Sequence, residues 1–374
     1  MRSPFIVATF LLVSGAVASE AFPSTDQLDA EVRRLMTAED VKGLALAVID
    51  DGTIVHVAAF GQRNVERGLP LETATVMYGA SLTKTAFAYM VLQLVDEGSF
   101  DLDRPLHTYL RQPLPDYEGY GDLAGDDRWR RLTARHVLNH STGFANFRWL
   151  EDDRRLRFHF TPGERYAYSG EGFNLLQFVL EEGLKLDVKA EMQQRIFDRF
   201  DMTKTSMQWR ADFAENLADG YAMDGTFEPH DERSNVRAAG SMDTTIDDQA
   251  RMWSGIVRGE GLSEASRAEL VRAQLPIHSA RQFPSLIEAR DPRGAQIQLA
   301  AGLGLVTFDA GRGKVWFKGG HNDWTGNMVV CEESARRCIV LIANSVRAEL
   351  IYPAIVELVL GDVGAPWWWE YGYD

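Results

Sequence analysis

Basic residues and cysteines are scarce in this sequence of 374 residues. It has 39 lysines and arginines against 54 aspartates and glutamates, and the resulting net charge of −15 at pH 7 is spread along the chain. An acidic surface repels nucleic-acid phosphates and anionic lipid headgroups. The charge balance therefore argues against nucleic acid and membrane surfaces as partners, while small neutral or zwitterionic substrates remain compatible with it.

Internal repeats, low-complexity runs and linker-like stretches are also missing. With 45% hydrophobic and 25% charged residues, the composition is that of an ordinary globular protein. A chain of this length can bury a large core, either as one domain or as two lobes that share a cleft.

The first residues have the pattern of an export signal. Arg2 precedes a mostly apolar stretch from Phe5 to Val17, and Ala-Val-Ala at 16–18 is a small-residue cleavage site. We expect residues 1–18 to be a signal peptide and the mature chain to be periplasmic or secreted, without a stable membrane span. An uncleaved anchor is the alternative, although the stretch is short for a span. No cysteine follows the signal, which argues against a lipoprotein.

The two cysteines, Cys331 and Cys338, lie in two β-rich runs around a polar turn. If residues 333–336 form that turn, the cysteines face each other across a hairpin, within reach of a disulfide. An exported chain meets an oxidising compartment, which favours this disulfide over two free thiols.

Strand patterns occur near both ends of the chain, while the middle is helical and rich in loops. The two-residue turn Asp51-Gly52 joins the first two predicted strands. Apolar residues at helical spacing indicate a helix near each end. The predicted strands are 44–49, 54–60, 302–308, 314–317, 326–330 and 337–343, and the predicted helices are 28–36, 173–180 and 350–360.

This order of elements predicts an α/β (α+β) fold, in which one antiparallel sheet is built from both termini and flanked by helices. An inserted, mostly helical lobe would occupy residues of about 78–295. The sheet lobe would combine about 26–77 with 296–362, and residues 19–374 would form a single catalytic domain. A small-molecule site is expected in the cleft between the lobes.

The strongest chemical signal is Ser-Leu-Thr-Lys at residues 81–84, which opens a helix that is almost wholly apolar from residue 86 to 95. Residues i and i+3 share a helix face, so the Lys84 amine can lie beside the Ser81 hydroxyl. Free N–H groups of the first turn favour a developing oxyanion, and burial lowers the pKa of a lysine. A capping serine with a lysine reaching water is the alternative, which the apolar turns disfavour.

Two further segments place polar side chains beside glycines. Tyr-Ser-Gly at 168–170 follows Pro-Gly at 162–163 in a loop that leads into a helix, and Lys-Gly-Gly-His at 318–321 ends a predicted strand. The glycines permit close backbone approach. Taken alone, each segment is also compatible with an ordinary surface loop or strand edge.

The three motifs, in this order, resemble those of the serine β-lactamase and penicillin-binding protein superfamily. The sequence is most similar to the branch with class C β-lactamases, DD-peptidases and related esterases. Segments 132–143, 238–250 and 302–304 also look like landmarks of that family. The resemblance covers nearly the whole mature chain. It implies a β-lactamase/transpeptidase-like fold and an acyl-transfer enzyme with neither metal nor cofactor.

The resemblance also implies roles for the matching residues. Ser81 would be the acylated nucleophile, and Lys84 would handle its proton. Tyr168 would be a general base or proton shuttle, its pKa depressed by the ammonium groups of Lys84 and Lys318. Whether the lysine or the tyrosine takes the first proton is left open by the sequence.

The third motif would bind the substrate. Lys318 would also offer positive charge to a substrate carboxylate, and Gly319 and Gly320 would let the strand edge approach the substrate. The backbone N–H groups of Ser81 and His321 would form the oxyanion hole. The His321 side chain would either line the pocket or pack under the following turn.

Gly170 departs from the class C pattern, which has Asn at this position. The missing amide removes a polar contact with the acylamide arm of a β-lactam and is expected to widen the site. The substitution therefore disfavours efficient cephalosporin hydrolysis. Asn174, Asn322 and His321 are neighbours that could replace the amide.

Two weaker signals have plain structural interpretations. His136 and His140 have a spacing that could hold a metal, but no Glu lies between them as in H-E-x-x-H sites, so we expect none. The aromatic tail from Trp367 to Tyr373 could contact a glycan or a membrane interface, although folding back onto the sheet or the terminal helix is favoured.

Three functions are compatible with these motifs. The first is a hydrolase that forms and releases an acyl-enzyme on a small ester, amide or β-lactam. The second is a D-amino-acid peptidase, DD-carboxypeptidase-like, that acts on short peptides of peptidoglycan. The third is a penicillin-binding sensor that acylates without turnover, which the lack of a visible linker or partner domain disfavours. The acyl group, the leaving group and the oligomeric state stay open.

Overall fold

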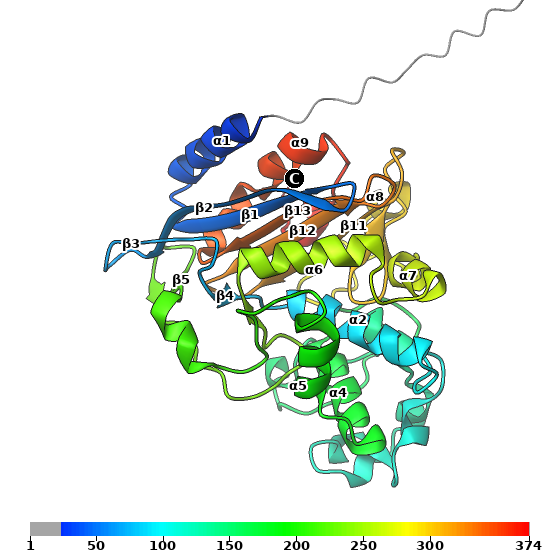
Figure 1. The fold of residues 1–374 in the computed structure, drawn as a ribbon. Coiled ribbons are helices and arrows are strands. Elements are labelled where there is room, and N and C mark those ends of the chain that lie inside the picture. Colours follow the sequence, from blue (N-terminus) through cyan, green and yellow to red (C-terminus); the bar gives the residue numbers. More distant parts are fainter. Residues whose placement is uncertain (1–23, 374) are drawn as a thin grey trace, which may run out of the picture.

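The computed structural model describes residues 24–373, so the predicted signal peptide, residues 1–18, lies outside the described residues. Nine strands form one antiparallel sheet in the order β3-β2-β1-β13-β12-β11-β10-β9-β8. Strands from the two ends of the chain lie side by side in it, because β1 pairs with β13 (Figure 1). The predicted α/β fold with an antiparallel sheet from both termini is confirmed. The nine strands are β1 (Gly43–Asp50), β2 (Thr53–Asn64), β3 (Leu69–Pro70), β8 (Leu275–Pro276), β9 (Ala300–Ala301), β10 (Val306–Phe308), β11 (Val315–His321), β12 (Gly326–Glu332) and β13 (Arg337–Ala343).

Alternate residues of β1 face two different cores, because successive side chains of a strand point to opposite sides of the sheet. Leu46 is buried on the side covered by helices α1 (Thr25–Ala38) and α9 (Tyr352–Leu360). Ala47 is buried on the other side, where α6 (Ile246–Arg258) packs against β1 and β13. Figure 1 shows the sheet between these two helical layers.

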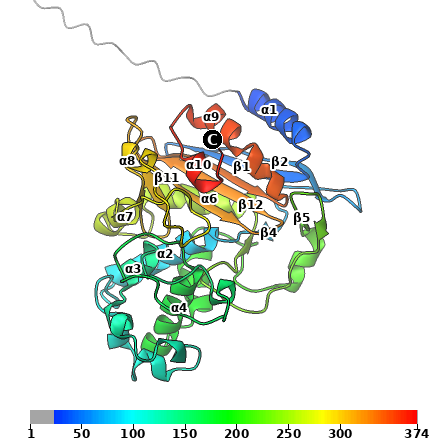
Figure 2. The same cartoon turned by 180° about the vertical axis from the view of Figure 1, so that it is seen from behind.

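The residues between the two parts of the sheet form a mostly helical region on the α6 side, as Figures 1 and 2 show from opposite directions. Helix α2 (Leu82–Asp96) runs through its centre, and every residue from 82 to 94 is buried. An all-round apolar helix of this kind belongs in a core. The other elements here are α3 (Ala134–Leu138), α4 (Gly170–Leu184), α5 (Val188–Met192), α7 (Glu264–Val271) and the short strands β4 (Met77–Tyr78), β5 (Gly220–Tyr221), β6 (Phe227–Glu228) and β7 (Asp243–Thr244). Helix α8 (Arg293–Gln296) instead connects β8 and β9 beside the sheet (Figure 1).

The prediction of a strand at 302–308 is wrong for the first half of that range, because the strand begins only at Val306. Gly304 has a φ of +74°, and its N–H donates to the carbonyl of Leu138 at 2.7 Å. A Cβ on this glycine would lie 2.8 Å from the Cβ of Ala88 and 3.0 Å from the carbonyl oxygen of Lys84. The segment is therefore a glycine turn that packs directly on α2, and this contact fixes the helix that carries the Ser-Leu-Thr-Lys motif.

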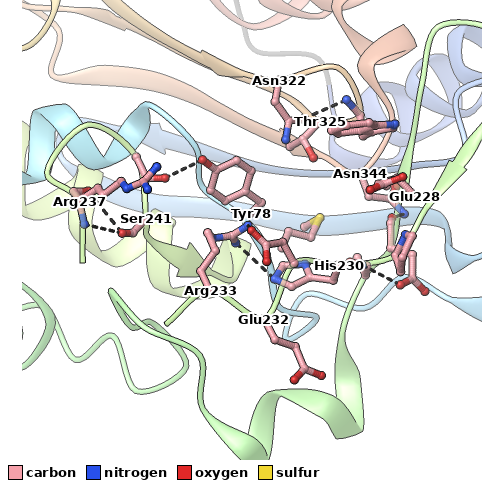
Figure 3. Close-up of a pocket in the computed structure, with 18 of the residues that line it drawn as sticks. Tyr78, Glu228, His230, Glu232, Arg233, Arg237, Ser241, Asn322, Thr325 and Asn344 are labelled. Carbon is pink, nitrogen blue, oxygen red and sulfur yellow. Dashed lines mark hydrogen bonds and ion pairs between the residues drawn. The ribbon is translucent and has the colours of Figure 1, made fainter. Parts of the chain in front are cut away.

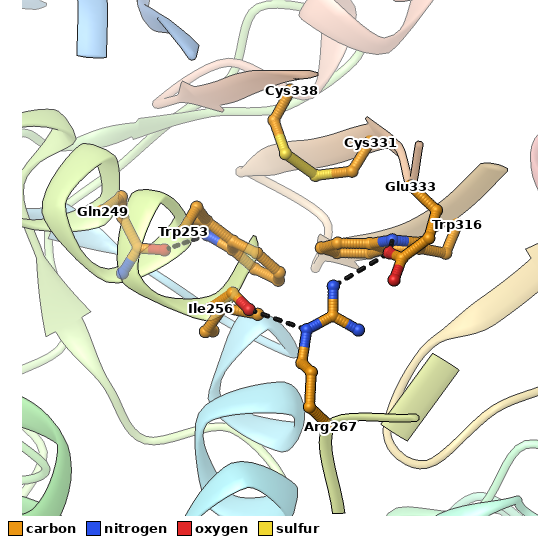
Figure 4. The surroundings of a disulfide bond; sticks show 8 residues. All are labelled: Gln249, Trp253, Ile256, Arg267, Trp316, Cys331, Glu333 and Cys338. Atoms are coloured by element: carbon orange, nitrogen blue, oxygen red, sulfur yellow. Dashed lines mark hydrogen bonds and ion pairs between the residues drawn. A yellow bond between two sulfur atoms is a disulfide. The ribbon is translucent and has the colours of Figure 1, made fainter. Parts of the chain in front are cut away.

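The structure pairs Cys331 with Cys338 in a disulfide, and the two residues are register partners on β12 and β13. Both are fully buried on the α6 side of the sheet. Figure 4 shows the disulfide near the rings of Trp253 and Trp316, whose centroids are 5.9 Å apart. The bond thus joins two adjacent strands inside the core rather than at the surface.

The aromatic tail folds back onto the molecule through α10 (Trp367–Glu370). Trp369 is fully buried, its ring centroid lies 6.3 Å from that of Phe317 on β11, and its indole N–H donates to the Ser279 hydroxyl at 3.1 Å. The tail therefore contacts the sheet, and Figure 2 shows α10 next to it. Nowhere in residues 24–373 is there a helix long and apolar enough to cross a membrane.

Candidate active site

Ser81 stands at the N-terminus of α2, immediately before its first residue, Leu82. Its side chain makes no capping hydrogen bond, so the hydroxyl is free for chemistry. The preceding residue, Ala80, has a φ of +46°, a left-handed conformation that costs free energy for a residue with a Cβ. Such strained backbone is typical of functional positions, and here it directs the start of α2 into the cavity.

Lys84 lies one helical turn further along α2, with 1% of its surface exposed. Its Nζ donates to Ser81 Oγ at 3.0 Å and also to the carbonyl oxygen of Ala239. Burial, and then the nearby charge of Lys318, lower the pKa of the Lys84 amine well below its usual value. A lysine held this way is in position to accept a proton from the serine hydroxyl.

Tyr168 and Lys318 lie on the other side of the serine, and both are 5% exposed. Lys318 Nζ donates to the Tyr168 hydroxyl at 3.2 Å, and Lys84 Nζ lies 4.9 Å from the centroid of the Tyr168 ring. The structure therefore brings Ser81 and Lys84, at the start of α2, together with Tyr168 and Lys318, from three segments that are far apart in the sequence.

The predicted depression of the Tyr168 pKa is wrong for the unliganded site. Burial raises the pKa of this phenol, and a hydrogen bond with Ser81 offsets the rise only in part. Burial also lowers the pKa of both Lys84 and Lys318. The same desolvation that disfavours the phenolate thus weakens the positive charges that would have stabilised it.

His140 is a positioning residue that the sequence did not reveal. Its ring stacks on the Tyr168 ring with centroids 4.2 Å apart, and its Nδ1 accepts the N–H of Ser169 at 3.0 Å. It therefore holds the tyrosine motif against the cavity. Within the described residues, no group of three or more His, Cys, Asp or Glu side chains is arranged to hold a metal.

One edge of β11 faces the cavity. Strand β10 pairs only with residues 315–317 of β11, so residues 318–321 leave that edge open. A Cβ on Gly320 would lie 3.0 Å from the backbone nitrogens of both Ser81 and Leu82. Glycine favours this close approach of β11 to α2, which sets Gly320 against the backbone of Ser81. The oxyanion hole of the Ser81 and His321 N–H groups stays a prediction.

These residues surround a cavity of about 250 Å³. Gly319, Gly320 and His321 line it from β11, as the sequence predicted, and the His321 imidazole also contacts Glu349 through Nδ1 at 3.1 Å. Three lining segments were not predicted. They are Asn146-Phe147, Gln282-Phe283 and the tail residue Glu370.

The prediction that Gly170 widens the site is wrong. A Cβ at this position would lie 2.3 Å from the Phe147 ring, so that ring fills the space an asparagine would need. Asn146 Oδ1 accepts the Gly170 N–H at 3.0 Å. The amide beside Gly170 that lines the cavity is therefore that of Asn146, whereas the predicted substitutes Asn174 and Asn322 do not line it.

A larger hollow of about 490 Å³ lies beside the turn at 322–325 and is lined by Tyr78, His230 and Arg233 among others (Figure 3). It shares no lining residue with the smaller cavity. Two of its charged groups are already paired, since His230 and Arg233 both contact the buried Asp243. The smaller cavity, which holds the serine and both lysines, is the candidate active site.

The fold and this serine–lysine–tyrosine–lysine cluster are those of a serine hydrolase. The chain belongs to the Beta-lactamase family, whose sequence model matches residues 28–355. The predicted relationship to serine β-lactamases and penicillin-binding proteins is confirmed.

Curated relatives are distant and differ in activity. A protein from Gluconobacter oxydans named D-aminopeptidase is 26% identical over 183 residues, which are 48% of this chain and 35% of the relative. An unguisins hydrolase from Aspergillus violaceofuscus is 22% identical over 278 residues, 67% of this chain and 48% of the relative. The matched part of this chain thus spans about half of such relatives or less.

Solved structures share the fold at low sequence identity. An octameric penicillin-binding protein homologue from Pyrococcus abyssi has a TM-score of 0.70 and 19% identity, with 90% of this chain and 77% of that chain covered. A D-alanine carboxypeptidase AmpC from Burkholderia cenocepacia has a TM-score of 0.68 and 18% identity, with 90% and 98% covered.

Proposed function

We propose that this protein is a hydrolase that forms an acyl-enzyme on Ser81 and releases it to water, acting on small esters or amides. The observation that carries the proposal is the 3.0 Å contact between Lys84 Nζ and Ser81 Oγ in a cavity that Tyr168 and Lys318 also line. A nucleophile, a desolvated base and a second proton carrier within contact of one another are the parts that acyl transfer needs.

The two pKa directions support an order of proton transfers. Lys84, whose pKa burial lowers, takes the Ser81 proton as the oxygen attacks the substrate carbonyl. The backbone N–H groups of Ser81 and His321 stabilise the resulting oxyanion. Tyr168, whose pKa burial raises, gives its proton to the leaving group and takes up the one that Lys84 removed from Ser81, so it ends the step protonated. Water then attacks the acyl-enzyme by the reverse sequence, which regenerates the serine.

The surroundings of Gly170 support esters over β-lactams as substrates. No side-chain amide is present at this position, Phe147 fills the space beside it, and the Asn146 carbonyl oxygen is already bonded to the Gly170 N–H. A lost directional contact of this kind weakens substrate positioning by about 1–3 kcal/mol. An activated ester needs less positioning, because its leaving group departs readily.

A substrate panel tests the proposed function. We expect wild-type protein to hydrolyse p-nitrophenyl acetate and butyrate, and Ser81→Ala to lose that activity. The kcat/KM for a chromogenic cephalosporin should be lower than for the esters by about 5- to 150-fold, the range that a missing positioning contact of about 1–3 kcal/mol predicts. A fast cephalosporin turnover without esterase activity would contradict the proposal.

Two further compounds in the same panel test the other two predicted functions, the D-amino-acid peptidase and the penicillin-binding sensor. The relative named D-aminopeptidase and the structural neighbour named D-alanine carboxypeptidase support including D-alanyl peptides. A fluorescent penicillin that stays bound for hours would instead favour a sensor or a D-amino-acid peptidase, and release of D-alanine would separate these two. We expect neither rapid release of D-alanine nor a lasting adduct.

We also propose that the protein acts in the periplasm or outside the cell. The export-signal pattern at its N-terminus supports this location, and so does the Cys331–Cys338 disulfide, because structural disulfides persist in oxidising compartments.

A further inference from the structure

A carboxyl group from the C-terminal tail lines the candidate active site. Glu370 is the last residue of α10, it is 6% exposed, and it borders the same cavity as Ser81 and Lys318. Its neighbour Trp369 is fully buried and anchors the tail on the sheet. Glu370 lies beyond residue 355, where the match to the family ends.

The Glu370 carboxyl lies flat against β11. A Cβ on Gly319 would be only 2.2 Å from Glu370 Oε1, so the glycine is what admits the carboxyl to the strand edge. Glu370 Oε2 accepts a hydrogen bond from the Gln282 side chain. Glu370 Oε1 has no hydrogen-bond partner in the described part of the chain, yet it is not sealed from solvent. This oxygen is available to a substrate.

The cations nearby do not use that oxygen. Lys318 Nζ donates to the Tyr168 hydroxyl and to the carbonyl of Gly319, and within the described residues it forms no ion pair with Glu370. The His321 imidazole pairs with Glu349 instead. Lys318 thus faces the Glu370 carboxyl without a direct ion pair, and Glu349 offsets the charge of His321, so the β11 edge has no large excess of positive charge for a substrate carboxylate.

The region beyond His321 is acidic as well. An open hollow that also borders His321 is lined by Asp224, Asp323 and Glu349, and its lining includes neither lysine nor arginine. Aromatic faces complete the surroundings, since the Phe283 ring lies 5.2 Å from that of Tyr168 and 5.5 Å from that of His321. Carboxylates beside aromatic rings are the usual elements of sites for organic cations.

The position of Glu370 also fixes which half of the substrate it contacts. It lies on the side of Tyr168 and Lys318, where the leaving group takes up its proton, whereas Asn146 and Phe147 lie toward Gly170. We propose that Glu370 binds a cationic nitrogen in the leaving group, so that the enzyme prefers esters or amides whose leaving group carries an ammonium and rejects those whose leaving group carries a carboxylate.

This inference rests on the proposed function, because it assumes acyl transfer to Ser81. The carbonyl carbon bonds to Ser81 Oγ, its bond to the leaving oxygen or nitrogen breaks, and the serine proton ends on that atom. The charge recognised by Glu370 stays on the departing molecule, and the acyl-enzyme left behind does not depend on it.

Three benzoyl esters test the proposal, because they yield the same benzoyl-enzyme and share its deacylation. Benzoylcholine has a cationic leaving group, 3,3-dimethylbutyl benzoate is its neutral isostere, and benzoyloxyacetate has an anionic leaving group. Burial raises the pKa of the Glu370 carboxyl to about 7, so the assay is run at pH 8, where the carboxylate predominates. There we expect the kcat/KM of wild-type protein to fall in that order, with at least about a tenfold preference for benzoylcholine over the isostere, as a desolvated ion pair provides.

Glu370→Gln keeps the shape of the side chain and removes its charge. We expect the benzoylcholine-to-isostere ratio of this variant to fall to within about threefold of one. The matched control is Glu357→Gln on α9, which removes an equal charge from an exposed position and should keep the wild-type ratio. Fluorophosphonate labelling of each variant reports the fraction of folded enzyme. If Glu370→Gln does not fold, the order of the three kcat/KM values of the wild-type protein tests the proposal by itself.

Equal wild-type rates, a preference for benzoyloxyacetate, or a choline preference that survives in Glu370→Gln would each overturn the role of Glu370. A protein that fluorophosphonate labels but that none of the three esters benzoylates would also overturn it, while leaving Ser81 as the nucleophile. A protein with neither labelling nor turnover would overturn the proposed function itself.

Discussion

At the residue scale, desolvation decides which group of the site acts as base and which as acid. Lys84 and Tyr168 are both buried, yet burial moves their pKa values in opposite directions, because it disfavours an ammonium in one case and a phenolate in the other. The sequence placed both side chains at the serine, but the burial that sets their pKa values depends on packing that only the folded chain supplies.

The pH profile of acylation should follow the Lys84 amine. Since burial lowers the pKa of Lys84 well below 10.5 and the free amine is the active form, kcat/KM for p-nitrophenyl acetate should rise with pH and level off well below pH 10.5. Lys84→Arg keeps a cation that cannot release its proton, and it should lose about 100-fold or more in kcat/KM. A profile still climbing at pH 10.5, or an active Lys84→Arg variant, would exclude Lys84 as the base.

The serine, both lysines and the tyrosine could be predicted because each belongs to a short motif of fixed spacing. The contributions of His140, Asn146 and Glu370 could not be predicted. Asn146 and Glu370 lie in segments without a motif, and the landmark at 132–143 assigns no role to His140. The sequence does show an acidic residue, Glu370, directly after three tryptophans in the tail. Only the folded structure, in which Trp369 is buried, shows that Glu370 points toward the site.

At the element scale, helix spacing and hairpin turns located most of the secondary structure, while glycine turns were mistaken for strand. The strand predicted at 337–343 coincides with β13, because β-branched residues and the turn before it are unambiguous. Residues 302–305 look equally apolar, but Gly304 has a positive φ and packs on α2. Tertiary contact overrode local pattern at that point.

Ion pairs tie the helical elements together, and one of them should be visible in acid unfolding. Glu269 on α7 bonds to Arg272, Gln274 and Arg135 of α3. The Arg272 hydrogen bond, against the opposing effect of burial and with help from Gln274 and Arg135, lowers the pKa of Glu269 to about 2. The folded-state pKa is depressed, so this carboxylate stabilises the fold above pH 4.5, the usual pKa of a glutamate, and the contribution is lost as the pH falls toward 2.

Thermal unfolding of Glu269→Gln measures this contribution. Because the carboxyl is about one third exposed, we expect the melting temperature to fall by only about 1–2 °C at pH 6, with the difference from wild type vanishing near pH 2. Glu264→Gln, at an exposed position of the same helix, is the matched control and should show no such pH dependence. A difference between wild type and Glu269→Gln that is constant from pH 6 to pH 2 would contradict the ion-pair account.

At the scale of the whole molecule, the site exists because the two ends of the chain share one sheet. Pairing of β1 with β13 completes the sheet, β11 presents an open edge at residues 318–321, and the inserted helical region brings α2 against that edge. The tail then returns across the sheet and adds Glu370. Family membership predicts the first three steps, whereas the last belongs to a part of this chain that the family match does not reach.

The central claim is that Ser81 is the nucleophile of this hydrolase, and covalent labelling tests it most directly. Protein treated with a fluorophosphonate is analysed by intact mass spectrometry and by mapping of the modified peptide. We predict one adduct per chain, located on Ser81, and none on Ser81→Ala with an unchanged circular dichroism spectrum. An adduct on another residue of the wild-type protein, or undiminished labelling of Ser81→Ala, would contradict the account.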